Sequence, residues 1–298
     1  MFKRFTLFIL TNILVLATIS ILMNVLGIGN YIEQGGINYQ TLMVTCLVWG
    51  MAGSLISLAL SRIMAKWMMG VKLIDPKSPG HYGWYLQTTY DVAKRAGLST
   101  MPQVGVFASS DVNAFATGPT KNRSLVAAST ALLETMSKDE IEGVIAHEVS
   151  HITNGDMVTM TLVQGVINAF VMFFARIIAY LVSQNVKDSL RPIVHVITVI
   201  VLQIALGFLG MMVVGWFSRK REFLADAGSA RLVGANKMKA ALQALQRIQG
   251  KIQLPEEQHQ SLAALQISNI HKRSTFSMLA STHPPLEDRI AALDRKTF

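Results

Sequence analysis

Two histidines with a glutamate between them are the residues of this sequence whose types and spacing best suit chemistry. His147, Glu148 and His151 form the pattern H-E-x-x-H. On a helix, side chains four residues apart lie on one face about one turn from each other, so both imidazoles can bind one cation. Zinc accepts two neutral imidazoles and a carboxylate and keeps a fourth position open for water, for which Glu148 can serve as general base.

The residues around the motif predict the helix that it needs. Ser137 and Glu140 match a capping box, with a serine at the cap and a glutamate three residues later, ahead of an apolar-periodic segment. The sequence Asn154-Gly155 predicts the end of this helix. Two histidines at this spacing could also be ordinary surface or core residues. The complete motif on a well-marked helix, in a chain whose single cysteine lies elsewhere, favours a catalytic metal site over a structural one.

The third metal ligand has to come from another part of the chain. The motif helix ends where an apolar run begins, and a later apolar run ends just before Arg221 and Glu222. Both runs therefore bring the chain to one membrane surface, where Glu222 offers a carboxylate. Asp226 lies four residues further on, on the same helical face, and could accept the N–H of a ligating histidine. Alternatively, Arg221 and Glu222 are ordinary surface charges of a solvated helix.

The elements that position these residues include membrane spans, because the composition is that of a membrane protein. Of the 298 residues, 51% are hydrophobic and 15% are charged, whereas an average soluble protein has about a quarter charged residues. The mean hydropathy is +0.39. Four stretches lack charged residues and can each hold a helix of roughly 20 apolar residues. They predict spans at about 5–28, 41–61, 157–182 and 192–217. The first could instead be a signal peptide, but its apolar run is too long and lacks a good cleavage site.

Basic residues flank the first, second and fourth spans on one side, which predicts that this side is cytoplasmic. They are Lys3, Arg4, Arg62, Lys66, Lys72, Arg219, Lys220 and Arg221. Both chain ends and the two polar stretches then face the cytoplasm. We therefore expect two spans in 1–69, two more in 157–218, and a discontinuous cytoplasmic domain made of 70–156, with the motif helix, and 219–298, with the third ligand.

The predicted fold is a mainly α integral membrane protein, with a small β-sheet in the first cytoplasmic part. Apolar periodicity predicts a helix over 77–97 that stops at Gly97. Short apolar runs at 103–108 and 124–129 are separated by a segment rich in turn residues. They predict two strands joined by a loop.

The combination of H-E-V-S-H at 147–151, R-E-F-L-A-D at 221–226 and four hydrophobic spans resembles the HtpX family of bacterial membrane metalloproteases. The likeness extends over essentially the whole chain, and that family is related to the CAAX prenyl-protein endopeptidases. The resemblance implies a gluzincin-type core in which His147, His151 and Glu222 hold one zinc ion and Glu148 acts as base. It also implies residence in the bacterial inner membrane and a role in membrane protein quality control under stress.

Two further segments carry the resemblance. The segment at 110–117 resembles the family's N-A-F stretch beside the cleft, which implies that Asn113, Ala114 and Phe115 position an extended substrate. It could instead be an ordinary junction between a loop and a strand. The segment around His283 resembles the H-P segment of the CAAX-type relatives, which implies that His283 stabilises the developing oxyanion. As a lone histidine it could equally cap the helix that follows.

Together these features predict a zinc-dependent endopeptidase that acts on membrane proteins or unfolded proteins at the cytoplasmic surface of the lipid bilayer. A processing peptidase restricted to lipid-anchored tails is one alternative, although four spans leave little room for a large intramembrane chamber. A membrane adaptor that keeps a metal without cleaving anything is another, and an intact Glu148 argues against it. The net charge of +9 would suit nucleic-acid binding, but the basic residues beside the spans account for much of it, so we expect no nucleic-acid partner.

Overall fold

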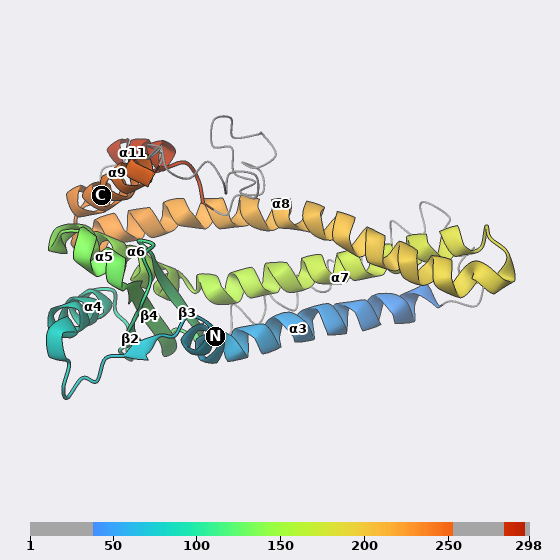
Figure 1. Cartoon of the computed structure of the whole chain (residues 1–298), viewed down its shortest axis with the longest axis horizontal. Helices are drawn as coiled ribbons and strands as arrows, with labels where there is room; N and C mark the ends of the chain where they lie inside the picture. Colours follow the sequence, from blue (N-terminus) through green and yellow to red (C-terminus); the bar gives the residue numbers. More distant parts are fainter. Residues whose placement is uncertain (1–37, 253–282, 296–298) are drawn as a thin grey trace, which may run out of the picture. The chain divides into compact units, whose positions relative to one another are not determined.

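The computed structural model describes residues 38–252 and 283–295, and most of them are helical (Figure 1). These residues divide into two compact units. One draws on the ranges Met1–Leu58 and Thr159–Val214, and the other on Ala59–Val158 and Gly215–Phe298. Three long helices contribute residues to both units, namely α3 (Tyr39–Met68), α7 (Asp156–Ser183) and α8 (Arg191–Val233).

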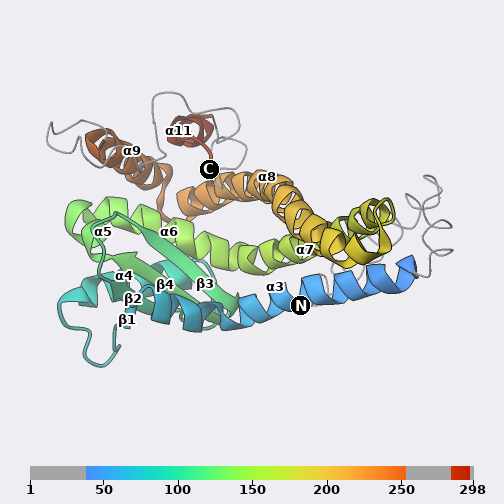
Figure 2. The same cartoon turned by 45° about the vertical axis from the view of Figure 1, so that its right-hand side comes forward.

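The first unit consists of helices suited to a membrane, and α3 and α7 lie side by side in it (Figure 2). The helices α3 and α7 and the segment Asp188–Val233 are each long and apolar enough to cross a bilayer, and they cover the last three predicted spans. The predicted span at 5–28 lies outside the described residues. Glycine allows α3 and α7 to approach closely, since a Cβ on Gly50 would lie 2.7 Å from the backbone nitrogen of Ala169.

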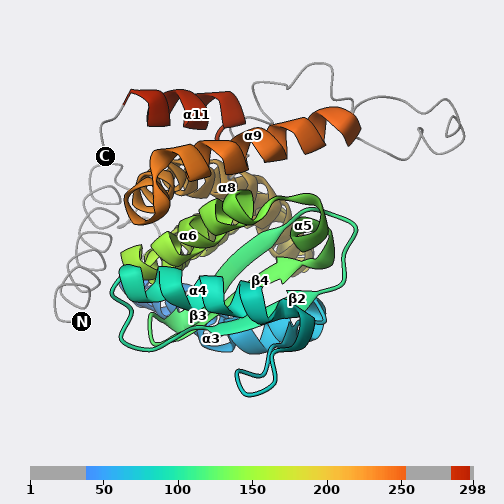
Figure 3. The same ribbon diagram turned by 90° about the vertical axis from the view of Figure 1, so that its left-hand side faces the viewer.

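The second unit is built around a four-stranded mixed sheet (Figure 3). Its strands are β1 (Lys72–Leu73), β2 (Gln103–Phe107), β3 (Ala114–Thr120) and β4 (Arg123–Ser129), in the spatial order β1-β2-β4-β3. The strands β2 and β4 are parallel, whereas β1 is antiparallel to β2 and β3 is antiparallel to β4. The strand β3 therefore forms one edge of the sheet.

The prediction of two strands was right for β2 and β4 but wrong for the segment between them, where β3 takes the place of the expected loop. The turn residues there do not stop the strand, because it continues with an irregular register between Thr117 and Thr120. Gly118 has a φ of +146°, and a Cβ at this position would lie 2.8 Å from the Cα of Ser124. Only glycine fits this close pairing without a shift of the backbone.

Helices pack on the sheet and on one another in the second unit. A 3-10 turn, η1 (Gly80–Tyr82), leads into α4 (Gly83–Arg95), and α5 (Thr130–Thr135) and α6 (Lys138–Asn154) follow β4. The helix α9 (Ala235–Ile252) packs against α6, and α11 (Leu286–Asp294) packs against α9.

The helix expected over 77–97 begins later than predicted, at Gly83. The backbone N–H of Lys77 donates to the side chain of Asp75, and this turn replaces the first helical residues. The predicted stop is confirmed, since Gly97 has a φ of +72° and its N–H donates to the carbonyl of Lys94.

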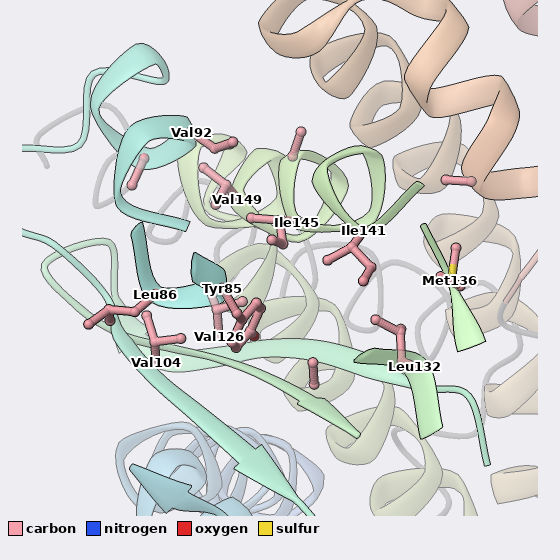
Figure 4. Close-up of a cluster of buried hydrophobic side chains, with 14 of the residues drawn as sticks. Tyr85, Leu86, Val92, Val104, Val126, Leu132, Met136, Ile141, Ile145 and Val149 are labelled. Atoms are coloured by element: carbon pink, nitrogen blue, oxygen red, sulfur yellow. The ribbon is translucent and has the colours of Figure 1, made fainter. Parts of the chain in front are cut away.

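The core of the second unit lies between the sheet and the helices α4 and α6 (Figure 4). Val104 and Val126 from the sheet meet Tyr85 from α4 and Ile145 and Val149 from α6. Burying each such side chain contributes roughly 1.5–3 kcal/mol. Because these contacts use one face of α6, His147 and His151 lie on the other side of this helix, which also packs against α9 through Gly143.

Candidate metal centre

The helix α6 carries the H-E-x-x-H motif and is held at both ends. The Ser137 side chain accepts from the N–H of Glu140 and the Glu140 side chain accepts from the N–H of Ser137, which confirms the predicted capping box. The helix ends at Gly155, whose φ of +71° suits glycine. Lys121, from the turn between β3 and β4, also donates to the carbonyl of Thr153 in the last turn. The motif thus stands on a helix with little freedom to shift.

The two motif histidines face each other on α6. Their Nε2 atoms lie 3.1 Å apart. Glu222, on α8, joins them, because its carboxylate oxygens lie 3.5 Å from Nε2 of His147 and 3.4 Å from Nε2 of His151. One ligand atom from each of the three residues lies within 4.8 Å of the other two. The structure therefore brings together the three side chains that the sequence assigns to a metal.

The spacing of these atoms fits a small divalent metal ion. With bonds of about 2.0–2.1 Å, two ligands of tetrahedral zinc lie roughly 3.3 Å from each other. The two Nε2 atoms are 3.1 Å apart, and each lies 3.4 or 3.5 Å from a different oxygen of the Glu222 carboxylate, which are values close to that separation. Two imidazoles and a carboxylate are also the donor set of catalytic sites that keep a fourth position open.

A carboxylate orients each imidazole by contacting Nδ1, the ring nitrogen that is not part of the metal-binding cluster. Asp226 Oδ1 lies 2.8 Å from Nδ1 of His147, and Asp156 Oδ2 lies 2.6 Å from Nδ1 of His151. When Nδ1 donates to a carboxylate, Nε2 is the nitrogen left to bind a metal. Asp226 stands where the sequence predicts such a partner. Sequence analysis did not identify Asp156 as a partner of His151, because a charged residue at the start of an apolar run indicates only the boundary of a span.

Arg289, on α11, is a second residue that sequence reasoning missed. Its guanidinium donates to Asp226 at 2.8 and 2.6 Å and lies 3.3 Å from Glu222 Oε2. The residue is 6% exposed, and arginine is buried to this extent only when it is paired. It balances part of the negative charge of the centre and ties α11 to α8. The one feature of the sequence that could point to Arg289 as part of the centre is its position six residues after His283.

Ion pairing sets the pKa values of the histidines in the metal-free centre. Burial disfavours the imidazolium of His151, but hydrogen bonds with Asp156 and Glu222 outweigh burial and raise the pKa of His151 to about 10. Burial acts in the same direction on His147, and hydrogen bonds with Asp226 and Glu222 again reverse it, so that the pKa of His147 is also raised.

The carboxylates of the centre shift in the opposite direction. Burial would raise the pKa of Glu222, but its bonds with the two motif histidines hold that pKa well below its usual range. For Asp226, the bonds with Arg289 and His147 likewise outweigh burial and lower the pKa. The centre therefore favours positive charge, whether protons or a metal ion supply it.

Glu148 opens onto a cavity of about 310 Å³ beside the histidines. His147, Glu222 and His283 line the same cavity, and Nδ1 of His283 lies 3.0 Å from Glu222 Oε2. A carboxylate, a metal-binding cluster and a further imidazole around one cavity are the groups needed to activate water and to stabilise an oxyanion. The structure thus places both residues that the sequence proposes as catalytic in one cavity.

The segment with the expected substrate contacts borders this cavity through only part of its length. Asn113 and Ala114 line the cavity, where β3 begins. Phe115 does not line it. Side chains alternate along a strand, and Phe115 packs against Phe107 and Ala127 on the other face of the sheet.

Comparisons with known proteins identify the family to which this chain is similar. A profile of Peptidase family M48 matches residues 82–297. The chain is 49% identical to the Protease HtpX homolog of Bacillus subtilis (strain 168), over 99% of this chain and 100% of that protein. It is 46% identical to Protease HtpX of Acinetobacter baumannii (strain AYE), over 97% of each protein.

A solved structure shares the fold. The crystal structure of S. mikatae Ste24p matches with a TM-score of 0.58 at 18% identity, and the match covers 96% of this chain and 66% of that chain. The protein therefore spans just under two thirds of the length of that structure. Together with the sequence relatives, this match confirms the resemblance predicted from the motifs. The chain belongs to peptidase family M48 and is a metalloprotease.

Proposed function

We propose that this protein is a zinc-dependent endopeptidase of the bacterial inner membrane that cleaves misfolded or damaged membrane proteins at the cytoplasmic face. One observation carries the proposal: the cavity that exposes Glu148 also exposes two members of the metal-binding cluster and the start of the edge strand β3. A metal that served structure alone would need neither a carboxylate in the cavity nor an edge strand beside it.

The cavity residues divide the chemistry of hydrolysis among them. His147, His151 and Glu222 would hold the zinc ion, which would polarise the scissile carbonyl and lower the pKa of the reacting water. Glu148 accepts a proton from that water as its oxygen attacks the carbonyl carbon. The same carboxyl group then donates the proton to the leaving amine as the peptide bond breaks. His283 donates a hydrogen bond to the oxyanion that develops during the attack.

The edge strand β3 positions the substrate in this proposal. It pairs with β4 on one side and with no other strand among the described residues. An extended peptide can therefore add to the sheet through main-chain hydrogen bonds, with its side chains alternating between the cavity and the opposite direction. Asn113 and Ala114 would lie beside the scissile bond, because they line the cavity that holds Glu148.

The membrane part of the proposal is supported by apolar length and by charge. With a further span at 5–28, the chain crosses the bilayer four times. Basic residues follow the apolar parts of α3 and α8, such as Lys66, Lys72 and Arg219, and favour the cytoplasm for these ends of the spans. The metal centre then faces the cytoplasm, where exposed loops and ends of membrane proteins are accessible. The relatives named Protease HtpX support proteolysis as the activity.

Cleavage of an unfolded membrane protein by detergent-purified, zinc-loaded protein tests the proposal. Glu148→Gln should reduce cleavage by about 10²-fold or more, since it removes the general base, while one zinc per chain is retained in elemental analysis. His147→Ala should lose both zinc and cleavage. Glu142→Gln, on the same helix but paired with Arg95, is the matched control and should keep both. Unchanged cleavage by Glu148→Gln, or no cleavage by the zinc-loaded wild type, would contradict the proposal.

A further inference from the structure

The membrane unit contains two adjoining cavities that are lined in part by polar side chains and that proteolysis as described above does not use. One, of about 340 Å³, is lined by α3 and α7, and the other, of about 400 Å³, is lined by α3, α7 and α8. Both include Gly53, Gln164 and Asn168, and the second also includes Gln203. We call the two cavities together the amide slot, after the side chains of Gln164, Asn168 and Gln203.

The amide slot lies in the middle of the apolar spans. Gln164 and Asn168 follow the start of α7 by 8 and 12 residues, and Gln203 follows the start of α8 by 12 residues. At about 1.5 Å of rise per residue, these amides lie roughly 12–18 Å along their helices from these starts, within segments long enough to cross a hydrocarbon layer about 30 Å thick. Polar side chains at that depth are costly and are commonly functional.

The amides use only part of their hydrogen-bonding capacity on one another. Gln164 Nε2 donates to Asn168 Oδ1 at 2.9 Å, and Asn168 Nδ2 donates to Ser54 Oγ at 3.4 Å. Each amide side chain offers two N–H donors and an oxygen with two lone pairs, so these contacts leave donors and acceptors over. Hydrocarbon provides no water to satisfy them, which favours a further polar partner inside the slot.

Glycines make the slot accessible to another helix. Gly53 on α3 and Gly207 on α8 line it, and a Cβ at either position would meet no atom of the described residues within 4 Å. On the same two helices, Gly50 and Gly210 are instead covered by residues of α7. Small residues are where membrane helices approach each other most closely. Within the described part of the chain, the slot therefore offers an open surface of the kind that accepts a helix.

We propose that the amide slot binds a transmembrane helix of a substrate protein, through an Asn, Gln, Ser or Thr side chain that has lost its own partner. This inference names a class of substrate for the proposed protease, and it therefore rests on the proposed function. A correctly assembled membrane protein keeps its polar side chains inside its own bundle, whereas a misassembled one exposes them to lipid. Three neutral amides suit an uncharged polar side chain, so the slot distinguishes such a helix from a fully apolar one.

The chain connects the slot with the metal centre. The helix α7 begins at Asp156, which bonds to His151, and α8 continues from Gln203 to Glu222. Both helices therefore connect the slot, along the chain, with residues of the metal centre. We expect a substrate helix in the slot to offer the loop that flanks it, and not the helix itself, for cleavage.

Two single-span substrates with the same unfolded cytoplasmic tail provide the test in liposomes. One has a span of Leu and Ala, and the other has one Asn at its centre. Wild-type protein should cleave the second about three- to tenfold faster, the range expected from one interhelical hydrogen bond in a bilayer. The double variant Gln164→Leu/Asn168→Leu should lose this preference and still cleave unfolded casein at the wild-type rate. Thr198→Val, a matched change from polar to apolar on α8 outside the slot, should keep the preference.

Photo-cross-linking separates binding from proteolysis. In the Glu148→Gln background, Trp49→p-benzoylphenylalanine at the slot should cross-link to the span with Asn and much less to the apolar span. If these cross-links form but wild-type protein cleaves neither substrate, the proposed proteolytic activity would be refuted, whereas binding of the helix in the slot would be supported. Equal cleavage and equal cross-linking of both substrates would overturn the proposal that the slot binds a helix with a polar side chain. Cross-links confined to the protein's own chain, or loss of casein cleavage in the double variant, would assign the slot to internal packing and also overturn it.

Discussion

Replacing Arg289 by methionine removes the guanidinium that bonds to Asp226 and faces Glu222, and keeps an unbranched apolar stem. Asp226 is 2% exposed and Glu222 is 3% exposed, so neither carboxylate can turn to water. Loss of one partner from a buried ion pair costs about 3–5 kcal/mol, because the remaining charge is left uncompensated. Since His147 still bonds to Asp226, we expect the lower end, about 3 kcal/mol, in the metal-free protein.

Zinc should reduce this cost. A divalent cation between the two histidines and Glu222 provides positive charge where the guanidinium was lost. In a domain of 150–250 residues, 1 kcal/mol shifts Tm by about 2–4 °C. Metal-free Arg289→Met should therefore melt about 6–12 °C below metal-free wild type, and saturating zinc should restore part of the difference.

Thermal melting of chelator-stripped protein in detergent, repeated with graded zinc, measures both effects. Arg295→Met is the control, because Arg295 is an exposed arginine at the end of the same helix, and it should shift Tm by less than about 2 °C. A metal-free shift below about 2 °C for Arg289→Met, or equal shifts for the two variants, would refute the reasoning.

Four further predictions concern the centre and the helix that carries it. Because the pKa of His151 is raised to about 10 in the metal-free protein and a ligand must be neutral, zinc should displace a proton at pH 7.5 and bind more tightly as pH rises towards 10. Calorimetry in buffers of different ionisation enthalpy measures this, and the absence of proton release would count against it. Because that pKa lies above the usual 6.5, metal-free stability should also fall as pH rises from 6.5 to 10. Ser137→Ala should cost about 1 kcal/mol by removing the cap of α6, whereas Ser137→Thr should cost less, as chemical denaturation of the two variants would show. Gly143→Ala should lower Tm although alanine favours helix, because its Cβ would lie 2.6 Å from the carbonyl oxygen of Lys237 on α9. An unchanged or raised Tm would contradict this prediction, because it would show that α9 can shift without loss of stability.

The parts of the protein that sequence alone determined are those governed by local interactions or by composition. The capping box of Ser137 and Glu140 acts within four residues, and Gly155 ends the same helix by its own backbone freedom. The orientation of His147 and His151 on one face then follows from helical periodicity. Long apolar runs likewise determined α3, α7 and the apolar part of α8, because a bilayer selects helices by length and hydropathy.

Only the tertiary structure decided the long-range contacts that no motif marks. Arg289 contacts Asp226 across 63 residues of sequence, through the packing of α11 on α9, and no local pattern encodes that contact. The strand β3 formed against its local turn signals because pairing with β4 satisfies its backbone groups. That pairing also turned Phe115 away from the cavity. In each case the deciding energy comes from contacts between segments that are far apart in the chain, and these exist only once the core has assembled.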